Sequence, residues 1–208
     1  METRNKILGA AIDLFRQYGF KNVTMDDIAR RAGISKKTLY QHFTNKPDIV
    51  EEAVVWFQSG TCCECEAAME ASANAIEAMV RVMHLLDKMY RQMNPLAMFE
   101  LQRFYPGAYE KFRKSLLDQD VKAVRANIER GIREGLYREG VDVDLLARFH
   151  IEAALMVLQP NLMVNDRYTL QQVNHVISEH FLYGLMTPKG EKLYQKYKDS
   201  YSQQPSKA

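Results

Sequence analysis

Seven consecutive residues, 36–42 (KKTLYQH), carry side chains whose types and spacing suit contact with a nucleic acid. Lys36, Lys37 and Gln41 offer two cations and an amide. At 100° per residue on a helix, Lys37 and Gln41 share one side and Leu39 lies away from them. Lysine and glutamine donate hydrogen bonds to base edges in the major groove, and cations and hydroxyls also contact phosphates. The segment therefore predicts a helix that is anchored by an apolar side and presents a polar side to DNA.

Capping residues define the helices that must position this segment. Thr24, with Asp27 three residues later, is typical of a helix N-cap with an acidic partner. Gly33 supplies the positive φ at which such a helix ends, and Ser35 is a second N-cap directly before the polar segment. Apolar residues at helical spacing between 3 and 18 predict one more helix ahead of these two. The pattern is that of a helix-turn-helix supported by a third helix.

This part of the chain resembles the DNA-binding domain of the TetR family of bacterial transcriptional regulators. The resemblance covers roughly residues 5–50, from AAIDLFRQYGF through to FTNKPDIV. The positions that carry it, in the family's order and spacing, are Phe15, Gly19, Thr24, Ile28, Ala29, Gly33, Ser35, Leu39, Tyr40, Phe43 and Lys46. The resemblance implies a DNA-binding head, a helix after Pro47 that links it to a C-terminal helical domain, and a homodimer.

Individual DNA contacts can be assigned from these residues. We expect base contacts from Lys36, Lys37 and Gln41, because lysine suits guanine and glutamine suits adenine. Contacts to the phosphate backbone, in positions that match the family's pattern, are expected from Thr24, Thr38, Tyr40, His42 and Lys46. Thr24 is also a cap, and His42 could instead pack against the core. A two-fold dimer would hold two such helices about one DNA turn apart and would bind a pseudo-palindromic double-stranded operator.

Positive charge is concentrated where this surface is predicted. The formal net charge is only +2, but residues 1–50 contain nine Lys/Arg and five Asp/Glu, which gives +4 there and −2 over the remainder. A basic first quarter on a nearly neutral body fits a localised nucleic-acid footprint. No run of about 18 apolar residues predicts a membrane span, and the start METRNKIL lacks the apolar run of a signal peptide. We expect a cytoplasmic protein with no membrane partner.

The remaining sequence predicts only helices, so the fold class is expected to be all-α with about nine helices. Residues 1–46 form the predicted helix-turn-helix domain, and 47–188 form a helical ligand-binding and dimerisation domain. Residues 189–208 are predicted to be a polar tail that frays or lies on the surface. The last two long helices, about 142–186, carry more apolar surface than one small bundle needs, which indicates a homodimer through them.

Within the second domain, prolines and glycines suggest where helices stop. Pro106-Gly107 predicts a turn, and residues 108–135 predict one long amphipathic helix after it. Pro160 predicts a kink in the following apolar helix.

The C-terminal bundle is also where the resemblance implies a small-molecule site. We expect an apolar or aromatic effector, because no charged cluster lies on an apolar helix face. The candidate contacts, each of which could equally be core, are Trp56, Cys62, Met83, His84, Phe99, Phe104, Tyr105 and Gln159. Binding would release a repressor if the effector favoured a conformer whose head spacing mismatches DNA. No cofactor is predicted.

A cluster of three cysteines offers an alternative trigger. Cys62, Cys63 and Cys65 are thiols that could bind a soft metal or become oxidised. On a helix they span about 300°, so they cannot all converge on one ion, although Cys62 and Cys65 share one side. We favour packing or pocket lining, and a regulator with the same DNA-binding head but a metal or thiol trigger stays as the alternative.

Nothing in the sequence predicts catalysis. Five histidines and scattered acids are present, but there is no Ser-His-Asp spacing, Gly-rich phosphate loop or HExxH motif. We therefore predict that the chain is a DNA-binding regulator and not an enzyme.

Overall fold

The computed structural model describes residues 2–158 and 167–202, and most of them are helical. The helices are α1 (Glu2–Tyr18), α2 (Met25–Ala32), α3 (Lys36–His42), α4 (Lys46–Glu70), α5 (Ala75–Arg91), α6 (Ala97–Phe104), α7 (Pro106–Ser115), α8 (Val121–Arg133), α9 (Val143–Val157), α10 (Leu170–Leu185) and α11 (Pro188–Ser202), with a π-helical turn, η1 (Leu116–Asp120), between α7 and α8. The described ranges contain no strand, only an isolated bridge between Tyr137 and Met186. The all-α prediction is confirmed, and the helix count is close to the one expected. Within these ranges, no helix combines the length and the apolar character needed to cross a membrane.

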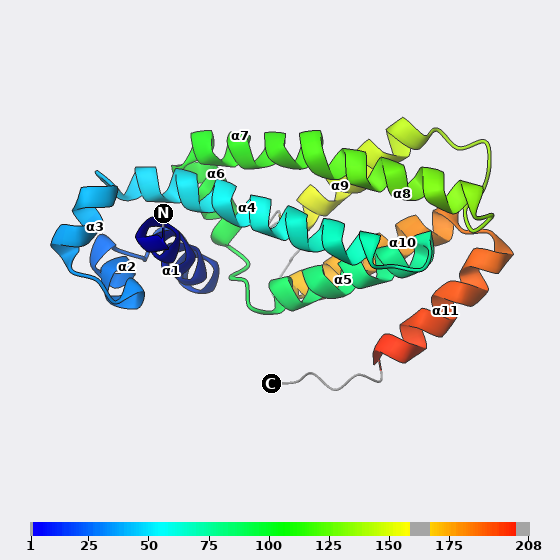
Figure 1. Ribbon diagram of the computed structural model, residues 1–208, viewed down its shortest axis with the longest axis horizontal. Coiled ribbons are helices and arrows are strands. Elements are labelled where there is room, and N and C mark those ends of the chain that lie inside the picture. The colour runs from blue at the N-terminus through cyan, green and yellow to red at the C-terminus, as the bar shows by residue number, and fades with distance from the viewer. Residues whose placement is uncertain (1, 159–166, 203–208) are drawn as a thin grey trace.

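Helices α1–α3 form a small head at one end of an elongated molecule, and α4 runs from this head into the larger helical body (Figure 1). The hydrophobic core does not stop between the two parts. One cluster joins Phe15 and Leu39 of the head to Leu101 of the body, and all three side chains are fully buried. The head and the body therefore share a core, which gives a mechanical path from one to the other. The domain boundaries at 46/47 and 188/189 stay predictions.

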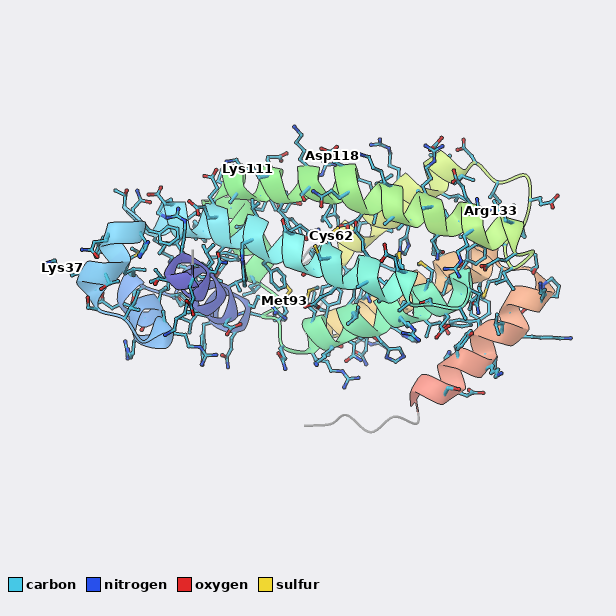
Figure 2. The ribbon with its side chains drawn as sticks, in the orientation of Figure 1. Lys37, Cys62, Met93, Lys111, Asp118 and Arg133 are labelled. Carbon is cyan, nitrogen blue, oxygen red and sulfur yellow. The ribbon has the colours of Figure 1, made fainter. Side chains whose placement is uncertain are left out.

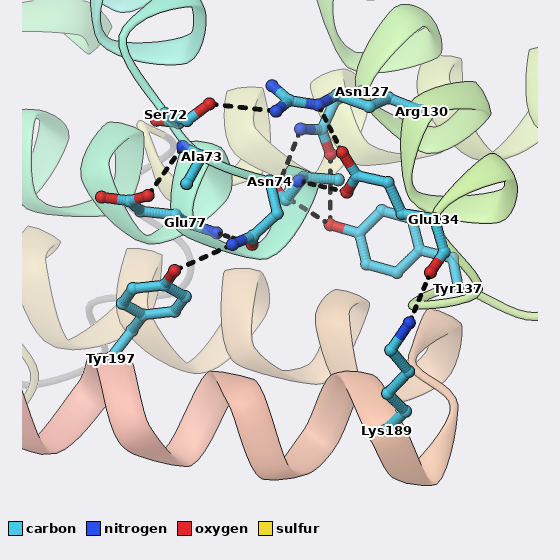
Figure 3. Close-up of polar contacts among 11 residues, drawn as sticks. Ser72, Ala73, Asn74, Glu77, Asn127, Arg130, Glu134, Tyr137, Lys189 and Tyr197 are labelled. Carbon is cyan, nitrogen blue, oxygen red and sulfur yellow. Dashed lines mark hydrogen bonds and ion pairs between the residues drawn. The ribbon is translucent and has the colours of Figure 1, made fainter.

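The far end of the body is organised around Tyr137, of which only 1% is exposed. Its hydroxyl donates to Oδ1 of Asn127 at 3.1 Å, and Nδ2 of Asn127 donates to the carbonyl of Ala75 at 3.0 Å. Figure 3 shows how Glu134 extends this network, because its carboxylate accepts from the backbone N–H of Ala75 and its carbonyl accepts from Lys189. The start of α5, the end of α8 and the start of α11 are thus fixed to one another.

The segment after Pro188 does not fray as expected, since residues 188–202 form α11. Tyr194 of this helix is 2% exposed, and the hydroxyl of Tyr197 accepts a hydrogen bond from Nδ2 of Asn74 at 2.8 Å. The polar composition of this segment did not indicate that two of its aromatic side chains, one helical turn apart, face the body.

Two further expectations about helix boundaries need correction. Pro106 does not lie in a turn but is the first residue of α7, where its missing N–H is not needed. The single helix predicted over 108–135 is interrupted by η1 and ends at Arg133. Pro160, with its predicted kink, lies outside the described residues.

Candidate DNA-binding helix and effector cavity

The caps predicted for α2 and α3 are all present. Oγ1 of Thr24 accepts from the N–H of Asp27 at 3.2 Å, and Oδ2 of Asp27 accepts from the N–H of Thr24 at 3.0 Å, so that the two residues form a capping box. Gly33 ends α2 with φ of 62°, which is the left-handed region. Oγ of Ser35 accepts from the N–H of Thr38 at 3.0 Å and starts α3. Local sequence alone therefore sets the turn between these helices.

One side of α3 is anchored in the head. Leu39 is fully buried and Phe43 is 3% exposed. The Arg4 guanidinium lies over the Phe43 ring at 4.3 Å and donates to the carbonyl of His42 at 2.9 Å. These contacts hold the end of α3 against α1, while the half-buried side chain of His42 stays at the edge of the surface.

The other side of α3 is open to solvent. Lys37, Tyr40 and Gln41 are exposed, and Lys37 lies at the outer end of the head, away from the body (Figure 2). Among the described residues, no hydrogen bond or ion pair holds the side chains of Lys37 and Gln41. Lys36 Nζ pairs with Asp26 at 2.7 Å, but both side chains are more than half exposed, and such surface pairs contribute little. This face is therefore accessible to a DNA groove, and contact with DNA would cost at most the weak ion pair between Lys36 and Asp26.

The two remaining candidates for phosphate contacts, Lys46 and Thr38, make hydrogen bonds within the protein. Nζ of Lys46 donates to the carbonyl of Lys21 at 3.3 Å, and burial lowers its pKa although Glu100 and Asp27 oppose that shift. Oγ1 of Thr38 is 2.8 Å from Oγ of its cap, Ser35. Lys46 lies beside the connection between α1 and α2, next to the Thr24 cap rather than on the face of α3.

Inside the body, a cavity of about 150 Å³ extends to α1. Its wall is mostly apolar and is contributed by α1, α4, α5, α6, η1 and α9, among other segments; Figure 2 labels two of its residues, Cys62 on α4 and Met93 after α5. The wall contains five methionines, which are Met69, Met79, Met89, Met93 and Met98. A cavity of this size in a protein core admits a ligand of about the size of benzene, and flexible methionines can repack to enlarge the cavity.

Polar groups interrupt the wall at η1. Asp120, the last residue of that π-helical turn, accepts a hydrogen bond from Nε2 of Gln58 at 3.0 Å. Burial raises the pKa of Asp120, although hydrogen bonds from Cys62 and Gln58 oppose the shift. Single π-helical turns are rare and are often found at functional sites, where they redirect side chains.

A histidine of α9 also lines the cavity. The imidazole of His150 stacks on Phe181 with 4.2 Å between ring centroids, and its Nδ1 is buried without a hydrogen-bond partner among the described residues. Burial lowers the pKa of His150 from 6.5 to about 4. The imidazole is therefore neutral at physiological pH.

This shift predicts an acid-labile contribution to folding. Because the folded pKa of His150 lies below the unfolded value, the unfolded chain takes up the proton first. The stability that depends on neutral His150 is complete above pH 6.5 and is lost as the pH falls toward 4, by up to about 3 kcal/mol. Urea unfolding of the native and His150→Leu chains measures the free energy of unfolding between these pH values. In the variant this free energy should fall less steeply as the pH is lowered. Parallel profiles would show that His150 does not titrate in this way.

The cavity lies apart from most of the predicted ligand contacts. Cys62 lines it, but Met83 is buried in the second core cluster and Tyr105 packs near Phe20 with 6.1 Å between ring centroids. The predicted contacts that are exposed instead are Trp56, His84, Phe99 and Phe104. Gln159 lies outside the described residues. Several polar wall residues were not predicted, because each occupies an ordinary polar position in a helical pattern. They are Arg16, Gln58, Thr61, Glu66, Asp120 and His150.

Two of the three clustered cysteines, Cys62 and Cys65, have the chemistry of packed thiols, whereas Cys63 is exposed. Burial, and then the charge of Asp120, raise the pKa of Cys62 and of Cys65 to about 12. A thiol must lose its proton to bind metal or to react, so neutral pH disfavours both reactions at these two positions. In the part of the chain that the structure describes, no group of three His, Cys, Asp or Glu side chains could hold a metal ion. These observations give no support to the alternative trigger.

Comparison with known proteins identifies relatives of both parts of the chain. Residues 7–53 match the family model described as bacterial regulatory proteins, tetR family. The HTH-type transcriptional repressor KstR2 of Mycobacterium tuberculosis is 27% identical over 70% of this chain and 74% of its own. IcaR of Staphylococcus aureus, a negative regulator of a biofilm operon, is 43% identical over 24% of this chain and 27% of its own. The structure of Bacillus subtilis FadR with stearoyl-CoA is 21% identical, with a TM-score of 0.63 over 86% of this chain and 98% of that one.

Proposed function

Because the chain belongs to the TetR family of bacterial regulatory proteins, we propose that it is a transcriptional repressor controlled by a small ligand. Its relatives are DNA-binding regulators, and the chain is one of them rather than an enzyme. In this proposal a homodimer binds a pseudo-palindromic operator and leaves it when a ligand occupies the body cavity. The observation that carries the proposal is the exposed face of α3, opposite the buried anchor of Leu39. On this face the side chains of Lys37 and Gln41 have no hydrogen bond or ion pair within the described residues.

The residues of the head take distinct roles on DNA. Lys37 and Gln41 are exposed on α3 and contact base edges, and Lys36 joins them when it leaves Asp26. Tyr40, Thr38 and His42 contact phosphates along the rim of the groove. Lys46 and the Thr24 cap contact the backbone from the start of α4 and of α2.

An exposed apolar stripe on α9 supports the dimer. Leu145, Phe149 and Met156 are 62%, 59% and 53% exposed, and their spacing places them within about 40° of one another around the helix. On α10, which packs against α9, Val176 and Tyr183 are also exposed and two turns apart. Apolar surface of this extent is typical of an interface, and a second copy of this chain covers it in our proposal.

The nature of the cavity supports an apolar effector. Its wall is dominated by methionine, leucine and aromatic side chains, and the relative FadR binds stearoyl-CoA, which carries a long apolar chain. A regulator that binds chromosomal DNA acts in the cytoplasm, which is the location we propose.

Two alanine substitutions test the DNA-binding roles. Lys37→Ala should weaken binding to the operator by about 1–3 kcal/mol and relax preference at one base position, because a base contact is lost. Lys46→Ala should weaken binding to all DNA sequences alike and reduce the salt slope by about one, because a phosphate contact is lost. Fluorescence anisotropy on the operator and on a scrambled duplex, over a range of salt concentrations, measures both effects.

The two variants serve as controls for each other, since both remove one lysine from the same head. An unchanged base preference in Lys37→Ala would remove this residue from the base-reading set. A loss confined to the operator in Lys46→Ala would contradict its phosphate role.

A further inference from the structure

Arg16 connects the head to the cavity. It belongs to α1, and its guanidinium lies over the ring of Phe57 of α4 with 4.8 Å to the ring centroid. Nη2 of Arg16 donates to the carbonyl of Met89 in the last turn of α5 at 2.9 Å. The backbone carbonyl of Arg16 accepts from the N–H of Asn94 at 2.6 Å. One residue of the DNA-binding head therefore contacts α4, α5 and the α5–α6 connection.

The same guanidinium is incompletely satisfied. Nε of Arg16 is buried, and it has no hydrogen-bond partner among the described residues. Burial lowers the pKa of Arg16, although the charge of Asp13 opposes that shift, and a guanidinium keeps its charge at neutral pH. A buried charged donor without a partner is costly, and an acceptor that reaches it gains a charge-assisted hydrogen bond.

Within the described wall, Arg16 is the one lysine or arginine that lines the cavity. Its neighbours in the wall at that end are apolar, including Phe57 and Met89. The acid that acts on its charge, Asp13 of the same helix, is exposed and lies outside the wall. The acidic wall residue Glu66 lies two and a half turns further along α4 than Phe57, about 13 Å away along the helix axis. The cavity is thus positively charged at the end that touches α1, which favours an anionic group there and an apolar body elsewhere.

We propose that the effector is an amphipathic anion whose carboxylate, or a similar acceptor, binds Nε of Arg16 while its apolar body fills the methionine-lined cavity, and that Arg16 passes this occupancy to α1. This inference rests on the proposed function and specifies the ligand class and the coupling residue.

The coupling follows from the position of Arg16. A carboxylate accepts from two adjacent N–H groups of a guanidinium, so it takes Nε and competes with the Met89 carbonyl for Nη2. The contacts that hold α1 to the end of α5 then change. Because α1 supports α2 and shares a core with α3, its displacement alters the relation between the two recognition helices of a dimer.

A series of probes with one chain and three head groups tests the ligand class. Octanoate, 1-octanol and octylamine present an anion, a neutral hydroxyl and a cation on the same apolar body. Calorimetric titration of the full-length chain should show octanoate binding about 10- to 100-fold more tightly than 1-octanol, with octylamine weakest. In Arg16→Gln, octanoate should lose this advantage while 1-octanol binds as before. Arg91→Gln, which alters an exposed arginine outside the cavity, should keep the native preference.

Retained binding of 1-octanol shows that Arg16→Gln is folded. If that variant does not fold, Arg16→Met keeps an unbranched side chain but removes both the charge and Nε, and it should lose the preference for octanoate. Failure of all three probes to bind, equal binding of octanoate and 1-octanol, preference for octylamine, or an octanoate preference that survives in the Arg16 variants would overturn the inference.

Anisotropy of an operator duplex tests the coupling separately. Octanoate should release the native chain from the duplex and should not release Arg16→Gln. Octanoate that binds without affecting DNA would overturn the role of Arg16 in coupling. A native chain that binds no DNA at all would overturn the proposed function. The head-group preference would still be tested independently by the calorimetry.

Discussion

A Phe149→Asp variant should be monomeric and should bind its operator about 10²–10⁴-fold more weakly than the native chain. The substitution places a charge in the middle of the exposed stripe on α9, where the partner protomer would bury it. A dimer binds its second half-site intramolecularly, at a high effective concentration, and a monomer loses that gain. Sedimentation velocity and operator anisotropy measure the two effects on the same sample.

Leu96→Asp is the matched control for this variant. Leu96 is 51% exposed and lies before α6, so its replacement by aspartate adds the same charge outside the stripe. It should leave the sedimentation coefficient of the native chain unchanged. A Phe149→Asp chain that remains dimeric and keeps full operator affinity would show that the interface lies elsewhere.

Tyr137→Ala should lower the free energy of unfolding by about 3–5 kcal/mol, which corresponds to a fall in Tm of about 10 °C. The side chain is 1% exposed, and its removal leaves a cavity at the junction of α5, α8 and α11. It also leaves Asn127 without one of its hydrogen-bond partners. Calorimetry or urea unfolding, at one protein concentration because the chain is expected to be a dimer, provides the measurement.

Two companion variants separate packing from hydrogen bonding. Tyr137→Phe keeps the ring and loses only the hydroxyl, so it should cost about 1 kcal/mol. Gly131→Ala keeps the tyrosine, but its Cβ would lie 2.0 Å from Cδ2 of the Tyr137 ring and must displace it. If Tyr137→Ala cost no more than Tyr137→Phe, the ring would not be the main contribution to this end of the body.

The DNA-binding head was predictable because its determinants are local. Thr24 with Asp27, Gly33 and Ser35 each act within a few residues, and the structure contains every cap that they predict. The orientation of α3 follows from Leu39 and Phe43, because buried apolar side chains on one side of a short helix leave the other side to the solvent.

The cavity was not predictable in the same way, because its wall assembles residues from helices that are distant in sequence. The sequence pointed to Trp56, which is 40% exposed, while its neighbours Phe57 and Gln58 line the cavity. A step of one residue rotates a side chain by 100° around α4, and apolar character alone does not say which side faces the cavity. The role of Arg16 depends on the carbonyl of Met89, which is 73 residues away.

In our proposal, two α3 helices, held at a fixed separation, present Lys37 and Gln41 to DNA. Selection of bound duplexes from a random-sequence library by the purified native chain tests it most directly. We expect enrichment of a pseudo-palindrome whose half-site centres lie about one helical turn apart or slightly further. Enrichment of a single unpaired half-site, or of no sequence at all, would contradict it.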